Sequence, residues 1–196
     1  LIKDDPSIYS WRAYDHDELG QHDLTIADFD SAIKLKPDDA FSYRGRGSAY
    51  VELGKDDLAM ADFDKAIALD PDSQDANIAY YNRGRLRFEK QPALAIADFD
   101  KAIALKPDDA ESYSLRGNAK VNMRQFAEAI GDFSKVLTLR PSDFDALVKL
   151  AALHSYTKNY VLAIAEYTKA LELKPDDLDT IYQRGLSYKD AGEYKL

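Results

Sequence analysis

Arginines and aspartates recur at fixed places in this sequence, and their pairing is the first chemistry that the residues suggest. The arginines at one equivalent place are Arg12, Arg46, Arg83, Arg116 and Arg184. The aspartates at a second equivalent place are Asp28, Asp62, Asp98 and Asp132. A guanidinium can bind the carboxylate of an acidic ligand through two parallel hydrogen bonds, or it can bind an aspartate of a packed neighbouring helix. The structural interpretation is favoured, because arginine suits partly buried bidentate pairs.

Catalysis has no support in the sequence. The three histidines, His16, His22 and His154, lack metal-ligand spacing with carboxylates, and no HExxH, P-loop or GxSxG stretch occurs. Gly45 and Gly47 alternate with arginines, but they lie inside a predicted helix, so that helix packing explains them better than phosphate binding. We therefore expect a protein that is not an enzyme and that needs no cofactor and no metal.

Charge and composition exclude several classes of partner. The formal net charge is −9, and acidic residues are spread along the whole chain. Phosphate backbones need clustered lysine and arginine, so we do not expect nucleic acid as a partner. No run of the sequence approaches the roughly 20 apolar residues that cross a bilayer, so we expect no membrane insertion. The absence of cysteine excludes disulfides and thiolate metal sites.

The cellular compartment is not assigned by the sequence. No signal-peptide pattern opens the chain, which begins at Leu1 rather than methionine. A cytoplasmic location is the default expectation, and a periplasmic or secreted location is the alternative if a leader was removed.

The charged residues belong to a repeated block whose clearest copy is LAIADFDKAIALKPDDA, residues 94–110. The prolines that close successive copies are Pro37, Pro71, Pro107, Pro141 and Pro175, at spacings of 34, 36, 34 and 34 residues. Within the block Ala95, Phe99, Ala102 and Ile103 fall on one face of a helix, as a buried stripe does. The proline then ends that helix, and an aspartate begins the next one. Repetition at this period is typical of stacked helical repeats.

The chain resembles the tetratricopeptide repeat family. In the second repeat the residues at that family's signature positions are Tyr43, Gly47, Tyr50, Ala59, Phe63, Ala66 and Pro71. The resemblance implies an all-α fold, a right-handed superhelical solenoid of antiparallel helix pairs with about five and a half repeats. The first helix of each pair (the A helix) would line a concave groove, and the second (the B helix) would carry the repeated block. The resemblance also implies a role in holding protein partners.

We expect residues 1–196 to form a single solenoid domain. The predicted repeats are a degenerate one over about 6–39, four over 40–73, 74–109, 110–143 and 144–177, and a partial one over 178–196. Residues 1–5 are expected to be a short lead-in, and the first helix should end at Gly20, a residue suited to a left-handed cap. Three extra residues follow Pro71, and we place them in a longer turn near Ser73–Ala76, since insertions in solenoids map to loops.

Recognition is expected on the open faces of the A helices, because these differ from repeat to repeat while the B helices are near copies. The predicted peptide-binding residues are Arg44, Ser48, Tyr81, Asn82, Arg85, Phe88, Asn118 and Asn122. They combine two cations, amides and aromatic faces, and such groups could hold the backbone and the anchor residues of a peptide. The sequence therefore predicts a scaffold that binds a peptide or helix of a partner protein in the concave groove.

Two other functions are kept as alternatives. The sixth repeat breaks off where its B helix should start, so apolar residues of its A helix, including Ile181, Leu186 and Tyr188, could pair with another copy of the chain. The module would then serve self-assembly as a homo-oligomer. The second alternative is a targeting arm of a larger protein.

Overall fold

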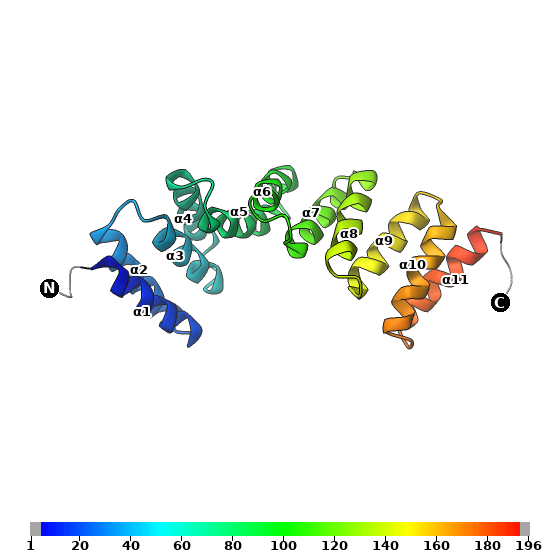
Figure 1. Ribbon diagram of the computed structural model, residues 1–196, viewed down its shortest axis with the longest axis horizontal. Helices are drawn as coiled ribbons and strands as arrows, with labels where there is room; N and C mark the ends of the chain where they lie inside the picture. Colours follow the sequence, from blue (N-terminus) through cyan, green and yellow to red (C-terminus); the bar gives the residue numbers. More distant parts are fainter. Residues whose placement is uncertain (1–4, 193–196) are drawn as a thin grey trace. The chain divides into compact units, whose positions relative to one another are not determined.

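The computed structural model describes residues 5–192, which contain eleven α-helices and no β-strand (Figure 1). The chain forms two compact units, Leu1–Pro107 (unit 1) and Asp108–Leu196 (unit 2). The helices of unit 1 are α1 (Pro6–Glu18), α2 (His22–Leu35), α3 (Ala40–Glu52), α4 (Asp56–Leu69), α5 (Gln74–Arg87) and α6 (Pro92–Leu105). The helices of unit 2 are α7 (Ala110–Asn122), α8 (Phe126–Leu139), α9 (Phe144–Tyr156), α10 (Tyr160–Leu173) and α11 (Leu178–Asp190). The predicted all-α class of paired helices is confirmed.

In each unit the helices pack as consecutive A and B pairs. In unit 1, α1 packs on α2, α3 on α4 and α5 on α6 (Figure 1). The B helices α2 and α4 also contact the A helices that follow them, α3 and α5. Unit 2 repeats this arrangement with α7 on α8 and α9 on α10, and α11 packs against α10. The predicted lead-in residues 1–4 and the last residues of the partial sixth repeat, 193–196, lie outside the described residues.

The turns between helices carry the capping residues that the sequence predicts. After a B helix, an aspartate accepts a hydrogen bond from the backbone amide three residues ahead, as in Asp39 to Ser42 (3.2 Å) and Asp143 to Ala146 (3.0 Å). Such caps satisfy amides that the first turn of a helix leaves unpaired. After the first A helix, Gly20 has φ = +68°, as its cap role requires.

The core consists of one large ring per repeat, packed against small residues. Phe29, Phe63, Phe99 and Phe133 are at most 2 % exposed, which confirms them as core residues. A Cβ atom added to Gly47 of α3 would lie 2.8 Å from the ring of Phe63 on α4. The glycine therefore lets the two helices approach closely, and the expectation that it serves helix packing is confirmed.

The turn before the third A helix differs from the prediction. The residues between α4 and α5 number four, Asp70–Ser73, as they do between α2 and α3, so the longer turn near Ser73–Ala76 is wrong. Ser73 caps α5 by accepting a hydrogen bond from the amide of Ala76 at 3.1 Å, and the helix begins at once. The extra residues lengthen the start of α5 by almost one turn, because a capped helix pairs their backbone groups, whereas a loop would leave them to water.

The close contact at Gly47 predicts a specific loss of stability. Gly47→Ala gains about 1 kcal/mol of helix propensity, but the crowding of a buried ring that has no free space costs about 1–3 kcal/mol. We expect a net loss of about 1 kcal/mol, and at most about 2 kcal/mol, in the free energy of unfolding, measured by urea denaturation followed by circular dichroism.

The matched control is Gly185→Ala on α11, which occupies the equivalent place after Arg184. A Cβ atom there meets no described atom within 4 Å. This variant should keep or raise stability by up to about 1 kcal/mol. Equal behaviour of the two variants would contradict the packing account.

Candidate functional site

The recurring arginines pair with aspartates of the B helices. Arg46 on α3 donates from Nε and Nη2 to the two carboxylate oxygens of Asp62 on α4, both at 2.7 Å, and from Nη1 to Asp30 on α2 at 2.5 Å. The hydrogen bond with Asp62 is the largest cause that raises the pKa of Arg46 above its ordinary value. One guanidinium thus joins the B helix of its own repeat to the B helix of the repeat before.

The same pair recurs along both units. Arg83 donates to Asp98 at 3.1 and 2.5 Å and to Asp64 at 2.6 Å. The corresponding pairs in other repeats are Arg12 with Asp28 and Arg116 with Asp132. Asp28, Asp62, Asp98 and Asp132 are at most 5 % exposed, so the structural interpretation is confirmed for the four arginines that they bind. Arg184 on α11 differs, because no carboxylate of the described residues pairs with it and its Nη1 atom donates weakly to Thr168 at 3.5 Å.

The fifth pair of helices, α9 and α10, breaks this ladder. Leu150 replaces the arginine, and the acid opposite it is Glu166, whose Oε2 atom is buried without a hydrogen-bond partner among the described residues. One turn after Leu150 stands His154, which is 8 % exposed and whose Nδ1 atom is also buried without a partner. Burial lowers the pKa of His154, and the nearby charge of Glu166 raises it by less, so that the net direction is down.

The lowered pKa of His154 predicts that acid weakens unit 2. The unfolded chain takes up a proton at this histidine near its ordinary pKa of 6.5, whereas the folded chain does so only at lower pH. Below about pH 6.5 the unfolded state therefore binds more protons, and stability falls as the pH falls through this window. Proton NMR of the imidazoles should give a midpoint for His154 below 6.5.

The control for this prediction is His154→Leu, which identifies the resonance and removes the titrating group. Its unfolding midpoint in urea should depend less on pH between 7 and 5.5 than that of the wild-type protein. Each unit by which the pKa of a group differs between the folded and unfolded states changes the free energy of unfolding by up to about 1.4 kcal/mol. A His154 midpoint at or above the ordinary value would contradict the prediction.

Arg44, the first of the predicted binding residues, is engaged inside unit 1. Its side chain donates from Nη2 to Asp75 and to the hydroxyl of Tyr14, both at 3.0 Å, and its guanidinium lies 4.8 Å from the ring centre of Phe41. The residue is 7 % exposed. Asp75 belongs to the added turn of α5, so the extra residues after Pro71 bring the partner that holds Arg44 in place. Sequence reasoning missed this acid, although the insertion itself was the signal.

The residues predicted on α5 form a more open group. Arg85 is exposed, its guanidinium lies 5.8 Å from the ring centre of Tyr81, and its Nη1 atom donates weakly to Asn82 at 3.5 Å. The ring of Tyr81 packs edge-to-face on Phe99, with ring centres 6.4 Å apart. Phe88 is half-buried at the end of the same helix.

The other predicted residues lie on α3 and α7. Ser48 on α3 is half-buried and donates from Oγ to the carbonyl oxygen of Arg44 at 3.2 Å. In unit 2, Asn118 is half-buried and Asn122 is exposed, both on α7. The structure therefore brings Tyr81, Asn82 and Arg85 into one cluster, which we call the α5 cluster.

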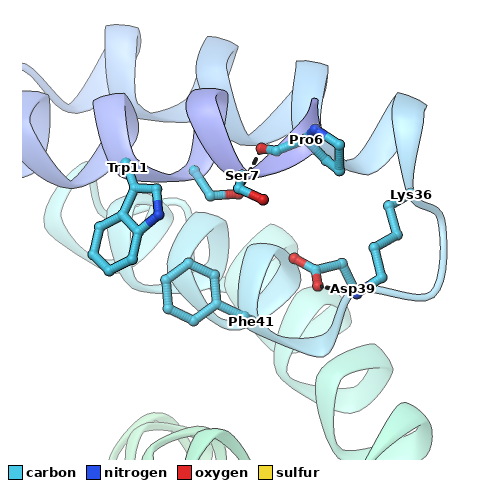
Figure 2. Close-up of a pocket in the computed structure, with 7 residues that line it drawn as sticks. Pro6, Ser7, Trp11, Lys36, Asp39 and Phe41 are labelled. Atoms are coloured by element: carbon cyan, nitrogen blue, oxygen red, sulfur yellow. Dashed lines mark hydrogen bonds and ion pairs between the residues drawn. The ribbon is translucent and has the colours of Figure 1, made fainter. Parts of the chain in front are cut away.

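A cavity at the start of unit 1 was missed by sequence reasoning. It lies between the first turns of α1 and the turn that joins α2 to α3, beside the exposed ring of Trp11 (Figure 2). The available signal was the single tryptophan of the chain, at a place where the next repeat has Gly45.

Comparison with known proteins shows the family. The profile of the tetratricopeptide repeat matches residues 12–74 and 114–177, together more than half of the sequence. The chain belongs to the tetratricopeptide repeat family. Proteins of this family are generally non-enzymatic scaffolds for protein–protein interaction.

Several solved structures share the fold. The structure of YrrB, a tetratricopeptide repeat protein with an unusual peptide-binding site, is 24 % identical and superposes with a TM-score of 0.80, each chain being covered to 93 %. MamA from Desulfovibrio magneticus RS-1 is 22 % identical with a TM-score of 0.76, covering 88 % of this chain and 97 % of its own. PilW, a type IV pilus biogenesis factor, is 21 % identical with a TM-score of 0.71, covering 96 % and 87 %. No curated protein sequence matches the chain.

Among residues 5–192 no three or more histidine, cysteine, aspartate or glutamate side chains are grouped so that they could hold a metal ion. None of the helices in that range is both long enough and apolar enough to traverse a bilayer.

Proposed function

We propose that this tetratricopeptide repeat protein is a non-catalytic scaffold that holds an extended segment of a partner protein against the α5 cluster. The proposal rests on Arg85, which has no carboxylate partner among the described residues. Of the five arginines on α3 and α5, the other four form ion pairs with aspartates, namely Arg44, Arg46, Arg83 and Arg87. No carboxylate of the described residues pairs with Arg85, so its charge is available to a ligand.

The surroundings of Arg85 support a docking role. The ring of Tyr81 packs edge-to-face on Phe99, and the guanidinium of Arg85 lies 5.8 Å from the centre of the Tyr81 ring. A side chain already held in place by packing loses little freedom when a ligand binds, which lowers the entropic cost of association. Tyrosine and arginine are also the residue types that carry much of the energy at protein interfaces.

The chemistry of the cluster favours a particular kind of segment. A guanidinium binds carboxylates through two hydrogen bonds, and the amide of Asn82 can both donate to and accept from an extended backbone. We infer that the partner segment places an acidic side chain on Arg85 and an apolar or aromatic one on Tyr81. Within unit 1 the proposal also includes Arg44, Ser48 and Phe88. Asn118 and Asn122 on α7 are proposed contacts of unit 2 by itself.

An array of short peptides with varied acidic and aromatic residues tests this function. We expect Arg85→Glu to lower the affinity of a selected peptide at least about tenfold, which corresponds to 1.4 kcal/mol, and binding of the wild-type protein to weaken as salt is raised. Fluorescence anisotropy of the labelled peptide measures both effects.

The matched control is Lys101→Glu, which makes the same charge change on an exposed position of α6. It should leave peptide affinity within about twofold of wild type, less than 0.5 kcal/mol. Circular dichroism checks that both variants stay folded. An equal loss in both variants would reduce the effect to net charge and would remove Arg85 from the proposed site.

Self-assembly remains the second candidate function, and one observation favours it. The side chains of Leu178, Ile181 and Tyr182 on α11 are 78 %, 40 % and 64 % exposed, and they form an apolar surface that another copy could cover. Leu186 and Tyr188, also predicted for this role, are half-buried.

Multi-angle light scattering tests self-assembly. If α11 mediates pairing, the molar mass should rise with protein concentration toward twice that of the 22.0 kDa chain. The double variant Leu178→Ser with Tyr182→Ser should then remain at the mass of one chain. A constant single-chain mass of the wild-type protein at millimolar concentration would reject this candidate.

A further inference from the structure

The cavity beside Trp11 has the size of a site for one anchor side chain. Its volume is about 250 Å³, and it is lined by Pro6, Ser7, Ser10, Trp11, Lys36, Asp39 and Phe41 (Figure 2). Sites for small molecules and cofactors commonly have about 300–1,000 Å³ and enclose most of the ligand. This cavity is smaller and opens beside an exposed indole, so it suits a side chain of an extended chain that continues across the surface.

Trp11 is not explained by the packing of the fold. Its side chain is 68 % exposed, and it is the only tryptophan of the protein. The equivalent places in the next four repeats hold Gly45, Asn82, Leu115 and Lys149, which differ widely in size and polarity. In later repeats this place lies against the phenylalanine of the preceding repeat: a Cβ atom added to Gly45 would clash with the ring of Phe29. No helix of the described residues precedes α1, so no such ring packs against Trp11. Tryptophan is, however, among the most frequent energetic anchors of protein interfaces.

The polar groups of the cavity are already satisfied, which leaves the rings as its recognition surface. Ser10 Oγ bonds with the carbonyl oxygen of Pro6 at 3.2 Å and with Ser42 Oγ at 3.1 Å. The carboxylate of Asp39 accepts from Ser42 Oγ at 2.6 Å and from Lys36 Nζ at 2.9 Å. Since these groups gain little from a polar ligand, the indole and the half-buried ring of Phe41 favour an apolar one.

Two exposed aspartates stand next in sequence to lining residues of the cavity, and we call them its acidic rim. Asp5 and Asp38 are exposed, and they directly neighbour the lining residues Pro6 and Asp39. The lining itself has no net charge, because Lys36 and Asp39 form an ion pair. An acidic rim around an apolar, uncharged cavity attracts a ligand that carries a positive charge next to its apolar anchor.

We propose that this cavity is a second docking site, which takes a proline of an extended partner segment with a lysine or arginine beside it. A proline-rich segment adopts an extended helix without internal hydrogen bonds, so its ring and its carbonyl oxygens are exposed and its ordering cost is low. Grooves lined by aromatic side chains bind such segments. Here Trp11 and Phe41 supply the aromatic wall, the indole N–H can donate to a carbonyl oxygen, and the negative charges of Asp5 and Asp38 attract the cation. The site goes beyond the α5 cluster, which is proposed for an acidic segment.

The test uses the full chain and a blocked synthetic peptide of three prolines followed by an arginine. Because Trp11 is the only tryptophan, its fluorescence reports directly on this cavity. We expect a saturable blue shift on addition of the peptide, as the indole leaves water. A peptide in which alanines replace the prolines should bind at least about fivefold more weakly, about 1 kcal/mol. Equal binding of the two peptides, or no shift at millimolar peptide, overturns the proposal.

Variants assign the site by calorimetry, which does not need the indole. Trp11→Ala should lower the affinity for the proline peptide at least about tenfold, 1.4 kcal/mol, and it should stay folded because the ring is 68 % exposed. Asp38→Asn should weaken binding about twofold and reduce its dependence on salt. Arg85→Glu should bind the proline peptide as the wild type does, so failure of the α5 cluster and failure of this site are distinguishable. Wild-type affinity in Trp11→Ala would overturn the assignment, as would a blue shift that follows protein concentration without peptide, because a second copy would then occupy the cavity.

Discussion

The close approach of the two helices in each pair is the contact on which the rest of this structure depends. Rings of the B helices lie against glycines of the A helices, Phe63 at Gly47 and Phe99 at Gly84, where an added Cβ atom would lie within 3 Å of the ring. In the sequence, each glycine follows an arginine and each ring follows an aspartate. Packing of ring on glycine therefore also brings the arginine opposite the aspartate. The ion pair is a consequence of the apolar contact, and the two together fix the register of the pair.

The ion pairs determine which cations of α3 and α5 remain at the surface, where a partner could bind them. A buried pair roughly breaks even in free energy, since removing two charges from water costs about as much as their attraction returns. Loss of one partner is costly, however, because it leaves the other charge buried without a counter-ion. The paired arginines therefore stay bound to their aspartates. Most cations of α3 and α5 are thereby withdrawn from the surface of an already acidic chain. Among these cations only Arg85 has no carboxylate partner in the described residues, and the proposed recognition of an acidic segment rests on this difference.

The sequence predicted what the repeat determines locally. Proline and aspartate placed the helix boundaries, and the 3.6-residue period placed the phenylalanines in the core, because both signals act within one turn of helix. Two features depended on contacts distant in sequence. The residues after Pro71 lengthened α5 and not the turn, and Asp75 in that added turn bound Arg44, which stands 31 residues earlier. The variation among A helices predicted binding residues on α5. Only the structure shows that the other arginines of α3 and α5 pair with aspartates, which distinguishes Arg85 from them.

Residues that depart from the repeat are of two kinds: some change the contacts of buried groups, and others do not. Leu150 is of the first kind, because its change from arginine leaves Glu166 Oε2 buried without a partner and His154 beside it. Trp11 and Arg85 are of the second kind. The places equivalent to Arg85 hold residues as different as Tyr14, Ser48, Asn118 and Ala152. Arg85 and Trp11 are themselves exposed, so neither side chain is required by the core. A large ring or a charge at such a place adds little to folding, and this is the ground on which both residues are proposed to contact molecules outside the chain.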